Sequence, residues 1–172
     1  MSGTRQRRRR VAPMNPSGRL DNCVAGVCAV IDRIEDGGDT GVTADTIEAE
    51  FGSTRMRREG TGSNPLVATP ARSLAYIREA TGLPVVSTQP IQGGLMAARV
   101  PGHYALFVNA GHVVYARVFP FGASFRAVIY DPQIARGFPS QDAYELFLGQ
   151  FNPGTRSSID AYFLGAVGSS FD

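Results

Sequence analysis

The chain begins with polar residues and then carries apolar residues at the spacing of helices. After residue 20 they recur every three or four positions, which predicts an amphipathic helix. These positions are Val24, Val27, Cys28, Ile31 and Ile34. Asp21 or Asn22 can cap this helix, and the sequence EDGGDTG ends it. We expect a short helix capped by Thr43 and a longer one from Thr69 to Gly82, because Thr-Pro begins helices and Gly suits the position after the last turn.

Beyond Pro84 the pattern changes from that of helices to that of strands. PVVST reads as a strand, and GGLMAARVPG is either a short helix or an extended segment. Three β-rich runs follow, HYALFVNA, GHVVYARVF and FRAVIYDP, and the short turns NAG and FPFGAS between them predict an antiparallel meander. Ser140 is expected to cap a helix over QDAYELFLGQF, and SSIDAYFLGAV to form the last strand. Helices first and an antiparallel sheet later indicate one α+β domain.

Composition narrows the class of protein. A chain of 172 residues with 43% hydrophobic residues can build one core, and no apolar run approaches the roughly 20 residues of a membrane helix. The start has no apolar stretch of the kind found in a signal peptide. Two cysteines on one helix, five positions apart, point about 140° from each other, so we expect no disulfide. They are also too few for a structural zinc site, so no metal or other cofactor is expected.

Charge separates the first residues from the rest. Residues 1–10 carry five arginines and no acid, whereas the remainder has 12 basic against 15 acidic side chains, a net charge of −3. We therefore expect a flexible basic arm over residues 1–19 and a folded domain over residues 20–172. The arm can bind nucleic acid or an acidic surface, or it is a solvated segment or a junction left from a longer precursor. The acidic body argues against a nucleic-acid partner for the domain itself.

The two cysteines of the first helix occupy different environments. Cys23 falls in the first turn, where unpaired N–H groups and the helix dipole favour an anion, so its thiolate is a candidate nucleophile. Taken alone, Cys23 could equally be a small buried core residue. We expect Cys23 to lie in a cleft that reagents can reach. Cys28 lies in the middle of the apolar stripe and is expected to be a small buried core residue.

The chain has only two histidines that could serve as the base of such a thiol. His112 opens a strand whose hairpin return ends at Asp131, so the two residues should be neighbours at one end of the sheet. A carboxylate bound to one ring nitrogen fixes the tautomer and supports the imidazolium. His103 is the rival, because it also follows Gly and opens an apolar strand, but its return strand ends without an acid. The alternatives are an exposed turn position for either histidine and a turn-initiating role for Asp131 before Pro132.

Three segments together resemble a known family. DNCVAGVCAV, YALFVNAGHVVYARV and VIYDPQ resemble papain-like cysteine peptidases, most of all the papain-fold toxin domains of bacterial polymorphic toxins. The order Cys, His, Asp agrees, and the motifs frame residues 21–133, although residues 36–100 match nothing in that family. Bacteriocin-processing peptidases of the same clan share the GH…DP pattern.

The resemblance implies a papain-like α+β fold, with the helix that carries Cys packed on a mainly antiparallel sheet that carries His and Asp. It makes Cys23 the nucleophile, His112 the base and Asp131 the orienting acid of a thiol hydrolase. The expected activity is that of a cysteine protease toxin or effector domain acting on a protein substrate; a glutamine deamidase would use the same groups. The chain would be made in a bacterial cytoplasm, delivered into the cytoplasm of a target cell and neutralised by a cognate immunity protein, with no membrane partner.

The oxyanion hole is the part of this pattern that the sequence lacks. The glutamine that usually stands a few residues before the cysteine is missing, and Asn15 or Asn22 could supply a side-chain donor beside the Cys23 backbone N–H. Gln133 fits the DPQ motif without a role that the sequence reveals. A non-enzymatic alternative is a binding domain with an arginine-rich arm, in which the Cys and His residues are incidental.

Overall fold

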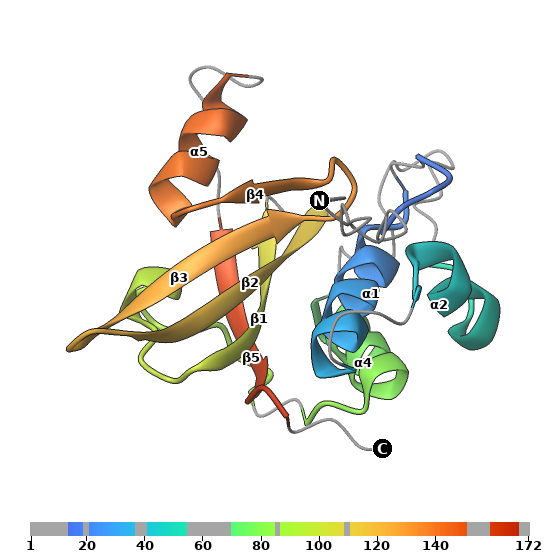
Figure 1. Cartoon of the computed structure of the whole chain (residues 1–172), viewed down its shortest axis with the longest axis horizontal. Helices are drawn as coiled ribbons and strands as arrows, with labels where there is room; N and C mark the ends of the chain where they lie inside the picture. The colour runs from blue at the N-terminus through green and yellow to red at the C-terminus, as the bar shows by residue number, and fades with distance from the viewer. Residues whose placement is uncertain are drawn as a thin grey trace, which may run out of the picture.

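The sheet and the helices form an α+β domain in the part of the chain that the structure describes. This computed structural model describes residues 14–18, 21–36, 41–54, 70–84, 87–108, 111–150 and 159–168. The helices are α1 (Cys23–Glu35), α2 (Ala44–Phe51), α4 (Pro70–Thr81) and α5 (Gln141–Gly149), with a 3₁₀ helix η1 (Leu95–Ala97). The strands are β1 (Gly102–Val108), β2 (His112–Phe121), β3 (Ser124–Asp131), β4 (Arg136–Phe138) and β5 (Ile159–Gly165). Figure 1 shows α1, α2 and α4 on one side of the sheet and α5 on the other.

The five strands pair in the order β4-β3-β2-β1-β5, and every pair is antiparallel. The predicted meander is therefore confirmed for β1 to β3, and the predicted last strand returns to pair with β1. Strand β4 was not expected, because its three residues are too few to show a period of two. Its pairing with β3 brings Arg136 opposite Asp131.

Local capping chemistry explains where two of the predicted helices begin. The Thr46 backbone N–H donates to the Thr43 hydroxyl at 3.2 Å, and the Ala143 N–H donates to the Ser140 hydroxyl at 3.1 Å. Asn22 is the N-cap residue of α1 by position, but its side chain makes no capping hydrogen bond. The expected cap Thr69 and part of the expected strand PVVST lie outside the described residues. The segment GGLMAARVPG forms η1 followed by extended chain.

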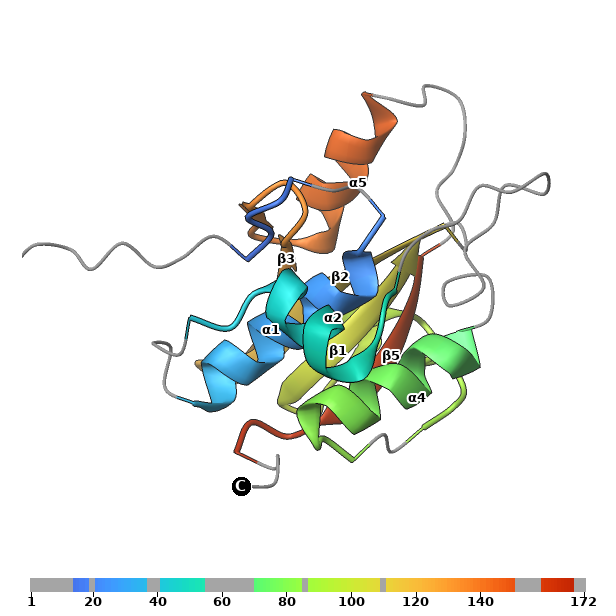
Figure 2. The same ribbon diagram turned by 90° about the vertical axis from the view of Figure 1, so that its right-hand side faces the viewer.

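Helix α1 is the centre of the larger core. Nearly every residue from Cys23 to Ile31 is buried, and the helix packs against α2, α4 and strand β2 (Figure 2). A helix that is apolar all round must be covered on all sides, which fits the small and apolar sequence VAGVCAVI. A second cluster fills the opposite face of the sheet beneath η1 and α5. None of the described helices has the length and apolar character needed to cross a membrane.

Candidate active site

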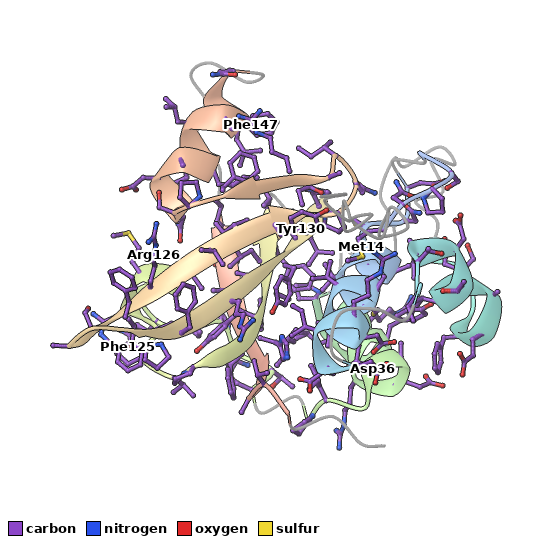
Figure 3. The ribbon with its side chains drawn as sticks, viewed as in Figure 1. Met14, Asp36, Phe125, Arg126, Tyr130 and Phe147 are labelled. Carbon is purple, nitrogen blue, oxygen red and sulfur yellow. The ribbon has the colours of Figure 1, made fainter. Side chains whose placement is uncertain are left out.

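Cys23 is the first residue of α1, as the sequence predicted, and residues 14–18 are hydrogen-bonded to the chain near it. The Asn22 side-chain amide donates to Asn15 Oδ1 at 2.8 Å, and the Ala44 N–H donates to the Met14 carbonyl at 2.7 Å. Met14 packs against the core around α1, and Figure 3 shows it beside the start of that helix. Residues 14–18, which the sequence assigned to the arm, are therefore hydrogen-bonded to the body of the domain.

His112 and Asp131 meet at the end of the sheet, where β2 begins and β3 ends. His112 Nε2 lies 2.9 Å from Asp131 Oδ2, so the neighbourhood predicted from the hairpin is present. Because a carboxylate only accepts, Nε2 carries the hydrogen of this bond. The Gln133 backbone N–H donates to the other oxygen, Asp131 Oδ1, at 3.0 Å. Both oxygens of Asp131 are thus held, which fixes the carboxylate against the ring.

The Cys23 side chain comes near enough to the same ring to influence its protonation. Since Nε2 is bound to Asp131, the nitrogen left for sulfur is Nδ1. Burial lowers the pKa of His112, but the hydrogen bonds and charges of Asp131 and Cys23 outweigh it and raise that pKa to about 10. At neutral pH His112 is therefore an imidazolium that donates to the Asp131 carboxylate and has the Cys23 side chain nearby.

The thiol is less accessible than the sequence suggested. Cys23 is only 1% exposed in the described part of the chain, whereas the His112 side chain is 27% exposed, and the cleft expected at Cys23 stays a prediction. Two cavities of about 490 and 550 Å³ lie elsewhere, one beside η1 and the start of α5 and one along α4. Neither is lined by Cys23, His112 or Asp131.

Cys28 occupies the buried position that its place in the apolar stripe predicted. It is 0% exposed, and burial, followed by the charge of Asp32, raises the pKa of its thiol well above the usual value. Such a thiol stays neutral and has neither a base beside it nor a path to solvent, which is the behaviour of a core residue.

His103 lies at the opposite end of α1 and takes no part in this site. It is 0% exposed, its Nε2 donates to Glu35 Oε1 at 2.6 Å, and its Nδ1 accepts from the Tyr115 hydroxyl at 2.6 Å. Burial lowers the pKa of His103, although Glu35 opposes this shift, so the ring is neutral. The sequence had correctly given no acid to its hairpin, but it gave no sign that Glu35 would come from α1.

The two asparagines predicted as oxyanion donors lie side by side, but they bind each other. Asn22 is fully buried, its amide nitrogen donates to Asn15 Oδ1, and its oxygen accepts from Gln133 Nε2 at 3.3 Å. This arrangement places Asn22 between two segments of the protein rather than in a position open to a substrate. A donor role for Asn15 or Asn22 stays a prediction.

Gly26 is a site residue that sequence reasoning missed. A Cβ atom at this position would lie 2.8 Å from Pro132 Cγ, closer than real Cβ contacts come. The absence of a side chain lets the loop after Asp131 lie directly on α1, one turn beyond Cys23. The signal in the sequence was a glycine inside an apolar helical stretch, which is unfavourable unless close packing requires it.

The described residues contain no cluster of three or more His, Cys, Asp or Glu side chains that could hold a metal ion. Comparisons with protein-family models, with curated protein sequences and with solved structures give no match for this chain.

Proposed function

We propose that this protein is a papain-like thiol hydrolase that cleaves an amide bond through Cys23, His112 and Asp131. The observation that carries the proposal is the arrangement around one imidazole: sulfur on one side and a held carboxylate on the other. Covalent catalysis typically uses three groups: a nucleophile, a base beside it, and a third group that orients the base. The order of the three residues along the chain and the motifs around them support the papain-like assignment.

The chemistry follows from the protonation state of His112. With His112 as imidazolium, Cys23 is paired as a thiolate, and its sulfur attacks the carbonyl carbon of the amide. The tetrahedral intermediate collapses when the imidazolium gives its proton to the leaving nitrogen, which leaves a thioester on Cys23 and a neutral ring. His112 then takes a proton from water, the hydroxide attacks the thioester, and the acid product and the thiol pair are restored.

Peptide-bond cleavage is the activity that the family resemblance favours. On this proposal the chain is the protease part of a bacterial toxin or effector, its substrate is a protein of a target cell, and an immunity protein protects the producing cell. These biological statements rest on the motifs at Cys23, His112 and Asp131–Gln133, not on the geometry, because a fold and a triad do not name a substrate.

The burial of Cys23 favours a second candidate, a protein glutamine deamidase. A peptide bond is flanked by chain in both directions, so it needs an open groove, whereas a glutamine carboxamide ends a slender side chain. A thiol that is 1% exposed beside a 27% exposed imidazole suits the second shape better. The chemical steps are the same, with ammonia as the leaving group.

Mass spectrometry of proteins from cells that express the wild type, Cys23→Ala or Cys28→Ala tests the proposal. New chain termini with the wild type and Cys28→Ala, but not with Cys23→Ala, would establish a protease. Conversion of particular glutamines to glutamate with the same dependence would establish a deamidase. If neither change depends on Cys23, the protein is not an amide hydrolase in those cells.

A further inference from the structure

A side-chain bridge joins the loop after Asp131 to the residue before Cys23. Gln133 Nε2 donates to Asn22 Oδ1 at 3.3 Å, across 111 positions of sequence. The same Gln133 donates its backbone N–H to Asp131 Oδ1 at 3.0 Å. One residue therefore contacts the acid of the triad through its main chain and the neighbour of the nucleophile through its side chain.

The Asn22 side chain takes part in this bridge and does not cap the N-terminus of α1. An asparagine at the N-cap position normally accepts a hydrogen bond from the second or third backbone N–H of its helix. In α1 no such side-chain bond forms; the oxygen accepts from Gln133 instead, and the amide nitrogen donates to Asn15 Oδ1 at 2.8 Å. Because Asn22 is 0% exposed, water does not replace these partners, and losing one would leave a buried polar group unpaired.

The Gln133–Asn22 hydrogen bond adds to a second contact, which fixes only the distance between the loop and α1. Pro132 rests on Gly26, and this contact sets how closely the loop can approach α1. A van der Waals contact between smooth surfaces allows sliding, whereas a directional hydrogen bond at Asn22 opposes it. Sliding of the loop along the helix would move Asp131 and His112 relative to the Cys23 sulfur.

We propose that Gln133 is a positioning residue that, through Asn22, holds Cys23 in line with His112. The inference rests on the proposed function, since it concerns the alignment of the same thiol and imidazole. Gln133 need not touch the substrate in this role. It acts by keeping the nucleophile and the acid–base pair, which belong to separate parts of the fold, in one geometry.

The test compares Gln133→Met, which keeps the length of the side chain but removes its donor, with Ile134→Ala at the next, 43% exposed position of the same loop. The readout is the rate at which iodoacetamide labels Cys23 between pH 5 and 9, which requires no knowledge of the substrate. We expect Gln133→Met to slow labelling at pH 7 by about 10-fold, because misplacement by ~1 Å can cost up to roughly 10²-fold. Its pH profile should move toward that of His112→Ala, while Ile134→Ala should match the wild type.

A purely structural role would lower the melting temperature of Gln133→Met without changing the shape of its pH profile, and that result would overturn the inference. Asn22→Ala gives a second, independent variant. It should show the same displaced profile, and the double variant should be no worse than Asn22→Ala alone, because Asn22→Ala already removes the bridge together with the bond to Asn15. Fully additive effects of the two substitutions would contradict the bridge.

The same experiment separates this inference from the proposed function. If His112→Ala changes the pH profile of labelling and Gln133→Met does not, then His112 activates Cys23 but Gln133 does not position it. If His112→Ala itself labels like the wild type, Cys23 is not activated by His112, and the proposed function falls with the inference.

Discussion

The two ends of α1 each bring a carboxylate, a histidine of the sheet and a third polar group together. At the first end, Cys23 and Asp131 flank His112; at the last, Glu35 and Tyr115 flank His103. Both histidines bind a carboxylate through Nε2, at 2.9 and 2.6 Å. The difference lies on the other ring nitrogen, where one histidine meets a thiol and the other meets a phenol.

That difference decides the charge of each ring. The Tyr115 hydroxyl donates to His103, so a neutral ring satisfies both partners, and complete burial favours the neutral form. Burial lowers the pKa of His112, but Asp131 and Cys23 raise it to about 10, so that ring is charged at neutral pH. The presence of a nearby carboxylate, which both sites share, therefore does not identify a catalytic histidine. The two rings differ instead in the thiol near His112 and in the partial exposure of the His112 side chain.

The helix itself adds to the contrast. The N-terminus of α1 carries a partial positive charge that favours an anion at Cys23. Its C-terminus lacks this support, and Glu35 is held there by the Gly168 backbone N–H, which donates to its oxygens at 2.8 and 3.0 Å, and by His103. The first end is arranged for a reactive anion, and the last end fastens the helix to the sheet and the segment after β5.

Replacing each histidine by alanine should give the largest difference in activity between the two ends of α1. His112→Ala should lower the activity by about 10²–10⁴-fold, the usual contribution of a general acid–base group, with a native circular dichroism spectrum. His103→Ala should keep most of the activity at a temperature where it is folded. Activity is to be measured once a substrate is known. An inactive but folded His103→Ala, together with an active His112→Ala, would reverse the assignment.

The two cysteines should differ sharply toward a thiol reagent. At pH 7 Cys28 stays a neutral thiol, because burial raises its pKa well above the usual value. Iodoacetamide should therefore label Cys23 first, with loss of activity, and Cys28 only after unfolding. Peptide mapping by mass spectrometry after timed labelling measures both rates. Equal labelling of both in the native protein would remove the case for Cys23 as nucleophile.

The C-terminal end of α1, where His103 is buried, should contribute to the free energy of unfolding. His103→Gln should lower the free energy of unfolding by roughly 1–3 kcal/mol, since it disturbs the hydrogen bonds of a buried carboxylate and phenol. Because the pKa of folded His103 is lowered, the native state resists protonation and the unfolded state does not. The stabilising contribution of His103 should thus shrink as the pH falls below about 6.5, so the stability difference between the wild type and His103→Gln should narrow over that range. Urea unfolding at pH 5, 6 and 7 measures both effects; parallel slopes would contradict this account.

A smaller loss of stability is expected from a substitution at Gly26, where the loop after Asp131 packs on α1. Gly26→Ala places a methyl group 2.8 Å from Pro132 Cγ, and either the loop or the helix must move. Overpacking of this kind usually costs about 1–3 kcal/mol, and the displaced loop should also slow labelling of Cys23. Ala25→Gly, on the same helix, controls for helix propensity. An unchanged melting temperature in Gly26→Ala would show that the contact is not tight.

The sequence revealed the parts of the site that depend on local pattern. The caps at Thr43 and Ser140 and the hairpin that joins His112 to Asp131 all follow from residues close together in the chain. The bond from Glu35 to His103 and the bridge from Gln133 to Asn22 span 68 and 111 positions, so no local pattern contains them. The burial of Cys23 was missed as well, because it arises from tertiary packing that no local pattern contains.

The central claim is that His112 is a cation paired with Cys23, while His103 is neutral. The chain contains only two histidines, so ¹⁵N labelling of histidine gives two rings to follow by NMR. At pH 8 we expect one imidazolium, assigned to His112 by its absence in His112→Ala, and one neutral ring. The imidazolium should lose its proton only near pH 10, and earlier in Cys23→Ala, because the sulfur contributes to the raised pKa. Two neutral rings at pH 8, or a proton held by His103 alone, would contradict the account.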